Sequence, residues 1–152
     1  MKSRCLCGKI EFEYELLPGL MGNCHCEECR RSSGSAFVTS LYINPTSHKI
    51  IKGEEYIQEY NHTPKLGRVF CKVCGSRLWN YGKLSNSAIA QAPFANVTAS
   101  SVVGEVPFKP QAHINLSEKV NWLDITDDLE KFEGIPPMEY FIKKMQGYAG
   151  SK

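Results

Sequence analysis

Three cysteines stand within six positions in the stretch Asn23-Cys24-His25-Cys26-Glu27-Glu28-Cys29-Arg30. Two further cysteine pairs flank this stretch, in Cys5-Leu6-Cys7 and in Cys71-Lys72-Val73-Cys74, so all seven cysteines lie in clusters. A disulfide framework usually needs an even number of cysteines, whereas zinc thiolates come in fours at a closed site and in threes at an open one. The spacing therefore predicts two zinc ions per chain, one structural and one reactive.

The closed site is assigned to the two cysteine pairs, because two pairs complete a tetrahedral tetrathiolate without a vacancy. Its predicted ligands are Cys5, Cys7, Cys71 and Cys74. Such a site contributes about 10 kcal/mol of folding free energy in small zinc peptides. Glycine follows each pair, as Gly8 and Gly75, and suits a tight knuckle whose backbone amides face the sulfurs. We therefore expect the quartet to tie the N-terminal strand to a strand that ends at Cys71.

The remaining thiols, Cys24, Cys26 and Cys29, are the candidate catalytic residues. Three thiolates bind one zinc ion and leave its fourth position for water or a substrate. Three negative ligands give the complex a formal charge of −1, which weakens its power to acidify water. Such a site can still bind an incoming thiol or polarise a carbonyl oxygen, so thiol chemistry is favoured over hydrolysis by a metal hydroxide.

Two other ligand arrangements remain open from the spacing alone. His25 could complete a second closed site, although three adjacent ligands would strain a tetrahedron. Alternatively, Cys24 and Cys29 could pair with Cys71 and Cys74, which would leave the first cysteine pair for another role. If His25 is not a ligand, it could be a base in a pocket, but the default expectation is a histidine that faces solvent.

Other candidates have ordinary structural explanations. His113 lies in an apolar context, which favours a core or rim histidine over a ligand. Trp79 and Trp122 are expected in the core more than in a pocket. Glu27 and Glu28 could act as general bases beside the thiols, but carboxylates on a helix surface are the default.

Composition limits the classes of protein that fit. The chain has 152 residues, 42% of them hydrophobic and 22% charged, which suits one globular domain. The net charge of +2 is too small to indicate a nucleic-acid partner. No apolar signal region follows Met1, and the longest apolar stretches are too short to cross a membrane. Seven thiols suit a reducing compartment, so a cytoplasmic protein is expected.

The hydrophobic pattern predicts a mostly β fold. Between Lys9 and Leu16, apolar and acidic residues alternate, as in a strand with one buried face, and Pro18-Gly19 predicts a turn after it. One short helix is expected at Glu27–Ser33. After Pro137, Met138, Phe141, Ile142 and Met145 fall at helical spacing, which predicts an amphipathic C-terminal helix. Asn61 to Leu66 is expected to form a loop. Further strands are predicted at 36–43, 49–52, 54–60, 68–71, 77–81, 88–94 and 113–116.

Three ordered motifs resemble a known family. They are Cys5-x-Cys7-Gly8 leading into Lys9-Ile10-Glu11-Phe12, Cys24-His25-Cys26-x-x-Cys29-Arg30 with Gly34-Ser35-Ala36-Phe37, and Phe70-Cys71-x-x-Cys74-Gly75-Ser76-x-Leu78. Together they resemble the glutathione-dependent formaldehyde-activating enzyme family, which is shared with centromere protein V. His113 and the segment from Trp122 to Leu129 resemble its C-terminal part, so the resemblance covers about residues 4–136.

The resemblance implies several coiled, short-stranded antiparallel sheets around a structural zinc. It implies the same quartet and trio, with a catalytic zinc that is labile. The implied activity is that of a carbon–sulfur lyase that joins glutathione, or another small thiol, to formaldehyde or another small aldehyde. Residues 1–136 would form the zinc-binding domain. Residues 137–152 lie outside the resemblance and would be a helical extension of the same domain, serving as the face of a homodimer or as a lid.

Two functions of other classes compete with this interpretation. The chain could be a zinc-stabilised binding module without catalysis, although its low charge disfavours a chromatin partner. It could also be a thiol or metal sensor that releases its second zinc when the trio is oxidised.

Overall fold

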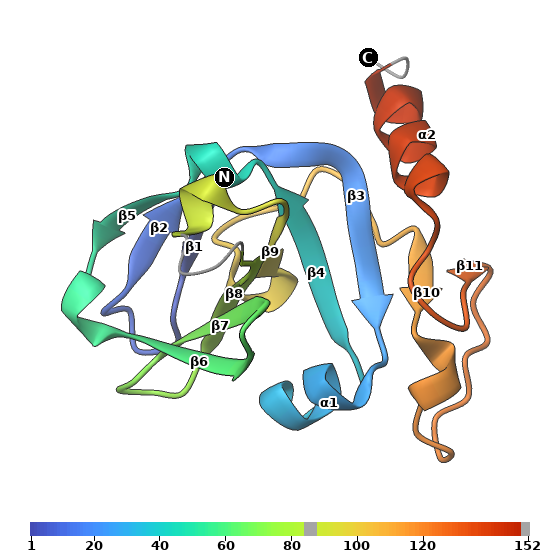
Figure 1. Ribbon diagram of the computed structural model, residues 1–152, viewed down its shortest axis with the longest axis horizontal. Helices are drawn as coiled ribbons and strands as arrows, with labels where there is room; N and C mark the ends of the chain where they lie inside the picture. The colour runs from blue at the N-terminus through green and yellow to red at the C-terminus, as the bar shows by residue number, and fades with distance from the viewer. Residues whose placement is uncertain (84–87, 150–152) are drawn as a thin grey trace. The chain divides into compact units, whose positions relative to one another are not determined.

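The computed structural model describes residues 1–83 and 88–149 (Figure 1). The chain divides into two compact units. The first unit holds Met1–Leu16 and Leu41–Val106, and the second holds Leu17–Ser40 and Pro107–Lys152. Within the described residues there are eleven strands and two α-helices, so the mostly β fold with short helices and a C-terminal helix is confirmed.

The first unit is built from antiparallel strands. Three of them form a sheet in the order β1-β2-β5, in which Phe12 of β2 lies opposite Ser3 on one side and Ile50 on the other. The other four, β6 to β9, pair in sequence order, each with the next. The strands are β1 (Lys2–Arg4), β2 (Glu11–Glu13), β5 (Lys49–Lys52), β6 (Ile57–Thr63), β7 (Leu66–Cys71), β8 (Arg77–Gly82) and β9 (Ala95–Thr98).

The core of the first unit contains the apolar residues whose alternation predicted a strand. Ile10 and Phe12 are fully buried, and Tyr14 is nearly so. Phe12 packs against the ring of Trp79, with 4.8 Å between the ring centroids, so the expectation that Trp79 belongs to the core is confirmed. Other core members come from β4 (Val38–Ile43), β7, β8 and β9, namely Ile43, Val69, Leu78, Tyr81, Ala95 and Val97.

In the second unit, β10 (Ala112–Ile114) lies between β3 (Leu16–Cys24) and β11 (Glu130–Lys131). Both pairings are parallel, unlike the antiparallel pairing expected for the whole fold. In the register with β3, His113 lies opposite Asn23 and Ile114 lies opposite Cys24. A parallel partner needs a long connection, which the 87 residues between Cys24 and Ala112 provide. β4 (Val38–Ile43) belongs to the second unit as far as Ser40 and to the first from Leu41.

The short helix α1 spans Glu27–Ser33, as predicted. Its N-cap is Cys26, whose sulfur accepts a hydrogen bond from the backbone N–H of Cys29. Gly34 ends the helix in the left-handed region, with a φ of 68° and its N–H bonded to the carbonyl of Arg30. The helix is thus bounded by a cysteine of the trio and by a glycine whose conformation other residues rarely adopt.

Two predictions near the N-terminus are wrong in detail. The alternating segment forms a strand only at Glu11–Glu13, and Leu16 already belongs to β3. Pro18 and Gly19 lie inside β3 instead of forming a turn. The ladder from β3 to β10 begins only at Gly22, so the missing N–H of Pro18 costs that ladder no hydrogen bond.

Three local expectations in the first unit need correction. Residues 88–94 do not form a strand: a 3₁₀ helix, η3 (Ile89–Gln91), precedes Pro93, and β9 begins only at Ala95. Pro93 cannot donate to a ladder, which explains the late start. The strand expected from Glu54 begins at Ile57, after η2 (Glu54–Tyr56). The loop expected at 61–66 is a tight turn, because β6 runs to Thr63 and β7 begins at Leu66. The remaining 3₁₀ helices are η1 (Pro45–Ser47), η4 (Ala99–Ser101) and η5 (Leu116–Glu118).

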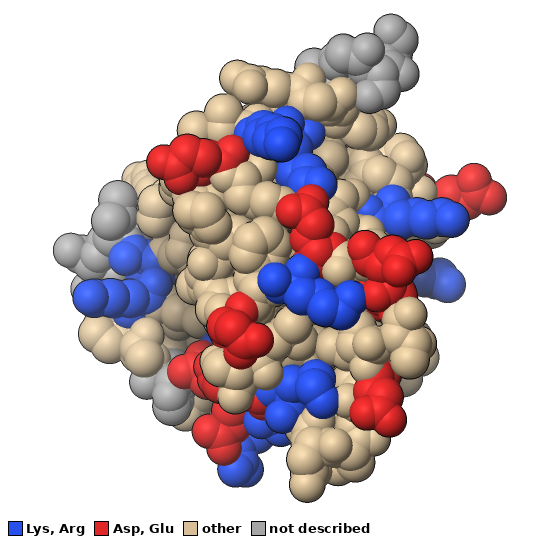
Figure 2. Space-filling view, turned by 90° about the vertical axis from the view of Figure 1, so that its right-hand side faces the viewer, with Lys and Arg blue, Asp and Glu red and all other residues tan. Residues whose placement is uncertain are grey.

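Charge is mixed on the face that Figure 2 shows, where acidic and basic side chains are interspersed. This distribution agrees with the small net charge of +2. Neither described α-helix combines the length and the apolar character that a membrane span requires.

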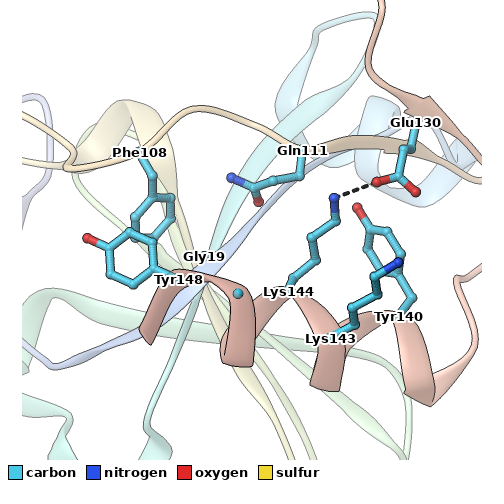
Figure 3. Close-up of a pocket in the computed structure, with 9 residues that line it drawn as sticks. Gly19, Phe108, Gln111, Glu130, Tyr140, Lys143, Lys144 and Tyr148 are labelled. Carbon is cyan, nitrogen blue, oxygen red and sulfur yellow. Dashed lines mark ion pairs between the residues drawn. The ribbon is translucent and has the colours of Figure 1, made fainter. Parts of the chain in front are cut away.

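The C-terminal helix α2 spans Met138–Ala149, so the predicted helix is confirmed up to the last described residue, whereas residues 150–152 lie outside the described part. Of the four apolar residues at helical spacing, Phe141 and Met145 are half-buried, whereas Met138 is 68% exposed and Ile142 is 43% exposed. The helix turns Tyr140, Lys144 and Tyr148 towards Gly19 and Phe108 (Figure 3). These residues line a concavity of about 450 Å³. In it, Lys144 forms an ion pair with Glu130, with 2.5 Å between Nζ and Oε1.

Gly19 permits this close approach of α2. A Cβ at Gly19 would lie 2.9 Å from the carbonyl oxygen of Lys144 and 3.1 Å from Cβ of Tyr148, and the glycine has a φ of +72°. We expect Gly19→Ala to destabilise the docking of α2 by about 2 kcal/mol. Limited proteolysis should then cut within residues 138–149 faster than in the wild type.

Gly34→Ala is the matched control, because Gly34 has a φ of +68° but no atom within 4 Å of a new Cβ. It should expose α2 no further. Equal cleavage of α2 in both variants would show that backbone strain, and not contact with the helix, is responsible.

Candidate metal centres

The four cysteines of the quartet meet in the first unit. The sulfurs of Cys5, Cys7, Cys71 and Cys74 all lie within 4.8 Å of one another. Cys5 and Cys7 are 3.4 Å apart at their sulfurs, and Cys7 and Cys71 are 3.9 Å apart. Two segments that are 64 residues apart in the sequence therefore present their thiols to one point.

Two similar backbone knuckles present these sulfurs. In the first, the N–H of Gly8 donates to the carbonyl of Cys5 at 3.0 Å, and in the second the N–H of Gly75 donates to that of Cys71 at 2.8 Å. Both glycines have positive φ, +72° and +73°, which is the conformation for which glycine was expected here. Ser76 joins the knuckles, since its hydroxyl accepts from the N–H of Leu6 and lies 3.2 Å from the sulfur of Cys74.

The quartet fits a tetrahedral thiolate site. A zinc–sulfur bond of about 2.3 Å places tetrahedral sulfurs about 3.8 Å apart, close to the spacings found. All seven cysteines are free thiols, so no disulfide competes for these sulfurs. The N–H of Ile10 lies 3.3 Å from the sulfur of Cys5 and would stabilise it as a thiolate. The cluster could therefore hold a metal ion.

The trio forms a second group, in the second unit. Cys24 is the last residue of β3, Cys26 caps α1 and Cys29 lies in its first turn, and their sulfurs are all within 4.8 Å of one another. The sulfurs of Cys24 and Cys26 are 3.5 Å apart. Two N–H groups donate to this group: the backbone of Cys29 to the sulfur of Cys26 at 3.4 Å, and the side chain of Asn115 to the sulfur of Cys24 at 3.3 Å.

The electrostatics of the trio also suit a cation. The neighbouring sulfurs of Cys26 and Cys29, together with burial, raise the pKa of the Cys24 thiol far above its ordinary value. Three thiols packed this closely cannot all ionise at neutral pH unless a positive charge joins them. A metal ion supplies that charge, so the trio is also a group that could hold one.

His25 does not face solvent, contrary to the default expectation, because its side chain is fully buried. Its Nε2 lies 2.8 Å from Nδ1 of His113, and Nε2 of His113 lies 2.9 Å from a carboxylate oxygen of Asp127. His25 does not belong to the group formed by the trio. Burial, and next to it the charge of His113, lowers the pKa of His25 to about 4, so its ring is neutral at pH 7.

The other candidate residues differ in their exposure and contacts. His113 is 2% exposed, so the expectation of a core histidine is confirmed. Trp122 was expected in the core but is 71% exposed, in a turn after η5. Glu27 forms an exposed ion pair with Arg31 at 2.7 Å, one helical turn away, as a surface carboxylate would. The alternative pairing of thiols is not the one found, since Cys71 and Cys74 share a group with Cys5 and Cys7.

Sequence reasoning did not single out Asn115 or Asp127, although both contact the surroundings of the trio. Asn115 has a φ of 57°, and it is the one non-glycine residue with positive φ among those described. Asparagine tolerates this conformation, but the sequence carries no signal that it would be adopted here. Asp127 stands in the run Asp124-Ile125-Thr126-Asp127-Asp128, where nothing distinguishes it from its neighbours.

Two known proteins are similar to this chain. A 28% identical segment of 78 residues, about half of each chain, is shared with a Schizosaccharomyces pombe protein named as an uncharacterized lyase. The match thus spans 55% of that relative's length. A crystal structure of a Rhodobacter sphaeroides protein superimposes with a TM-score of 0.56 at 24% identity, over 70% of this chain and 92% of that one, which shows a shared fold.

The family comparison covers the larger part of the chain. Residues 1–118 match the model of the glutathione-dependent formaldehyde-activating enzymes, and this range includes all seven cysteines. The match ends before β11 and α2, so those elements lie outside the shared part. With both thiol groups inside a match of this extent, the chain belongs to the glutathione-dependent formaldehyde-activating enzyme family.

Proposed function

We propose that this protein is a zinc-dependent carbon–sulfur lyase that joins glutathione, or another small thiol, to a small aldehyde. The observation that supports it most is the second thiol group, in which Cys24, Cys26 and Cys29 could hold one ion with three ligands. Family membership over residues 1–118 supplies the thiol and the aldehyde as the substrate classes. The name of the yeast relative supports a lyase in general.

The two groups have different roles in this proposal. The quartet would hold a structural zinc with no vacant position, because four thiolates complete a tetrahedron. The trio would hold the catalytic zinc, which when bound supplies a Lewis-acidic position for a thiolate or a carbonyl oxygen. The N–H groups of Cys29 and Asn115 would withdraw charge from two of the three sulfurs. This withdrawal offsets part of the excess negative charge that three thiolates bring.

The proposed reaction adds a thiol across a carbonyl group. The sulfur–carbon bond forms, the carbon–oxygen double bond becomes single, and the thiol proton ends on the oxygen. No electrons are gained or lost, so no oxidant or reductant is needed. The protein contributes by holding both reactants together, which replaces a bimolecular encounter with an oriented one.

Exchange NMR with glutathione and ¹³C-formaldehyde tests this proposal. The wild-type protein should speed the interconversion of free formaldehyde and S-hydroxymethylglutathione above the uncatalysed rate, and Cys26→Ser should return it to that rate. Glu27→Gln is the control, since Glu27 is an exposed helix carboxylate and this variant should keep the wild-type rate. Wild-type protein that leaves the exchange rate unchanged would contradict the formaldehyde assignment.

A further inference from the structure

A buried hydrogen-bonded series leads from the surface of the second unit to the loop between two cysteines of the trio. Its members are Asp127, His113 and His25. The carboxylate of Asp127 is 48% exposed, whereas His113 is 2% exposed and His25 is fully buried. The two contacts measure 2.9 Å and 2.8 Å, both within the range of strong hydrogen bonds.

The outer hydrogen bond of the series has a defined direction. An ionised carboxylate can only accept, so Nε2–H of His113 donates to Asp127. Nδ1 of His113 and Nε2 of His25 share the inner hydrogen bond. The ring of Phe37 lies 5.1 Å from the ring of His25 and 6.1 Å from that of His113. The orientations of both imidazoles are therefore held by hydrogen bonds at their edges and by an aromatic neighbour.

His25 connects this series to the metal-binding group, because it stands between Cys24 and Cys26. Its backbone is held as well: its N–H donates to the carbonyl of Ile114 at 3.0 Å, and its carbonyl accepts from Nε of Arg30 at 3.0 Å. Ring, N–H and carbonyl are thus all bonded, so the path of the chain between the two cysteines is fixed from three directions.

The same strand supplies a direct contact with the trio. β10 carries His113, and Asn115 follows its last residue in the left-handed conformation. The side chain of Asn115 donates to the sulfur of Cys24 at 3.3 Å. β10 therefore reaches the trio twice, once through His25 and once through a sulfur.

We infer that Asp127 and His113 are positioning residues, which act through His25 to hold the sulfurs of Cys24 and Cys26 at the spacing that a metal ion requires. This inference rests on the metal-binding part of the proposed function, and it does not depend on the lyase reaction. Residues around metal ligands commonly change metal affinity tenfold to a hundredfold, because without them the ligands must be ordered by the metal itself.

Metal retention against a chelator tests the inference. Metal content per chain is measured at rising chelator concentration. The metal that the wild type releases and Cys26→Ser does not is the metal of the trio. His113→Leu removes both hydrogen bonds and keeps an apolar side chain in the buried space. Asp127→Ala removes the outer contact at an exposed position, together with the hydrogen bond from the N–H of Leu129 at 3.1 Å and the ion pair with Lys131 at 3.9 Å. We expect each variant to lower the affinity of the trio for metal by about tenfold or more, with the metal of the quartet unchanged.

Two controls separate positioning from a general effect on the fold. His48 is a half-buried histidine, packed against Trp79 in the first unit, and His48→Leu should leave the metal affinity of the trio unchanged. Asp128→Ala changes the exposed neighbour of Asp127 and should also have no effect. Since Asp127 acts through His113, the double variant His113→Leu/Asp127→Ala should lose no more affinity than His113→Leu alone.

The outcomes are distinct. If the wild type and Cys26→Ser release the same metal, the trio holds none, and both the inference and the proposed function are wrong. If the wild type shows the extra metal but His113→Leu and Asp127→Ala retain it as tightly, only the inference is overturned. Additive losses in the double variant would also overturn it, because Asp127 would then act by a separate route.

Discussion

Cys74→Ser should unfold the first unit, whereas Cys26→Ser should leave the protein folded. After Cys74→Ser only three thiolates of the quartet remain, so the site binds its metal more weakly. In small zinc peptides the metal contributes about 10 kcal/mol to folding. That is comparable to the whole stability of a typical domain, about 5–15 kcal/mol. Cys74 is only partly buried, so its replacement tests the metal more than the packing of the core.

Circular dichroism and metal content measure both effects together. Cys74→Ser should lose its cooperative thermal transition or be recovered only as insoluble protein. Cys26→Ser should melt cooperatively and carry about one equivalent of metal less than the wild type. Equal destabilisation by the two substitutions would indicate that both thiol groups are structural and would remove the argument for an open site.

Gly53→Ala should be strongly destabilising, because this glycine lies against the backbone of Lys9 and Ile10, which directly follow the knuckle of Cys5 and Cys7. A Cβ at Gly53 would overlap the carbonyl oxygen of Lys9, lie 2.8 Å from its carbon and come within 3.1 Å of Cα of Ile10. These are backbone atoms, which cannot make room by rotation about a side-chain bond. The backbone N–H of Ile10 in turn donates to the sulfur of Cys5, and the carbonyl of Ile10 accepts from the N–H of Cys5. A shift at Lys9 would therefore reach the quartet.

We expect Gly53→Ala to lower the free energy of unfolding by about 3 kcal/mol or more, and Gly104→Ala by about 1 kcal/mol. Gly104 is the matched control: it has a φ of +91° in the same unit, but no atom lies within 4 Å of a new Cβ. Urea denaturation of both variants measures the difference. Similar losses would show that backbone conformation alone, and not the approach to Lys9, makes glycine necessary at position 53.

The local features were predictable because they depend on neighbours in the sequence. Helix α1 begins after Cys26 and ends at Gly34, and both signals are visible in the chain itself. Alternation identified Ile10, Phe12 and Tyr14 as buried, although only three residues of that segment are paired as a strand. Backbone pairing depends on partners far along the chain, whereas the burial of one face depends on the pattern alone.

The wrong predictions of burial share one cause, which is that the exposure of a side chain depends on what the rest of the chain brings to it. Trp122 is 71% exposed in a turn that the described part of the chain leaves uncovered, even though its size favours burial. The face of α2 that packs inward carries Tyr140 and Lys144, since Gly19 lets the helix approach there. Proline and glycine at positions 18 and 19 suggested a turn, but the strand continues through them.

The sequence by itself placed all seven thiols in three local clusters and predicted a quartet and a trio, but it left other pairings of the clusters open. The tertiary structure brings Cys5, Cys7, Cys71 and Cys74 into one group and Cys24, Cys26 and Cys29 into another. The sequence also determined the mostly β character and the single helix beside the trio. Only the tertiary structure decided what surrounds those sulfurs: the burial of His25, its contact with His113 and Asp127, and the amide of Asn115 beside Cys24. The contacts of His25 with His113 and of Asn115 with Cys24 join residues about ninety positions apart. The parallel pairing of β3 with β10 that creates these two contacts leaves no local pattern in the sequence.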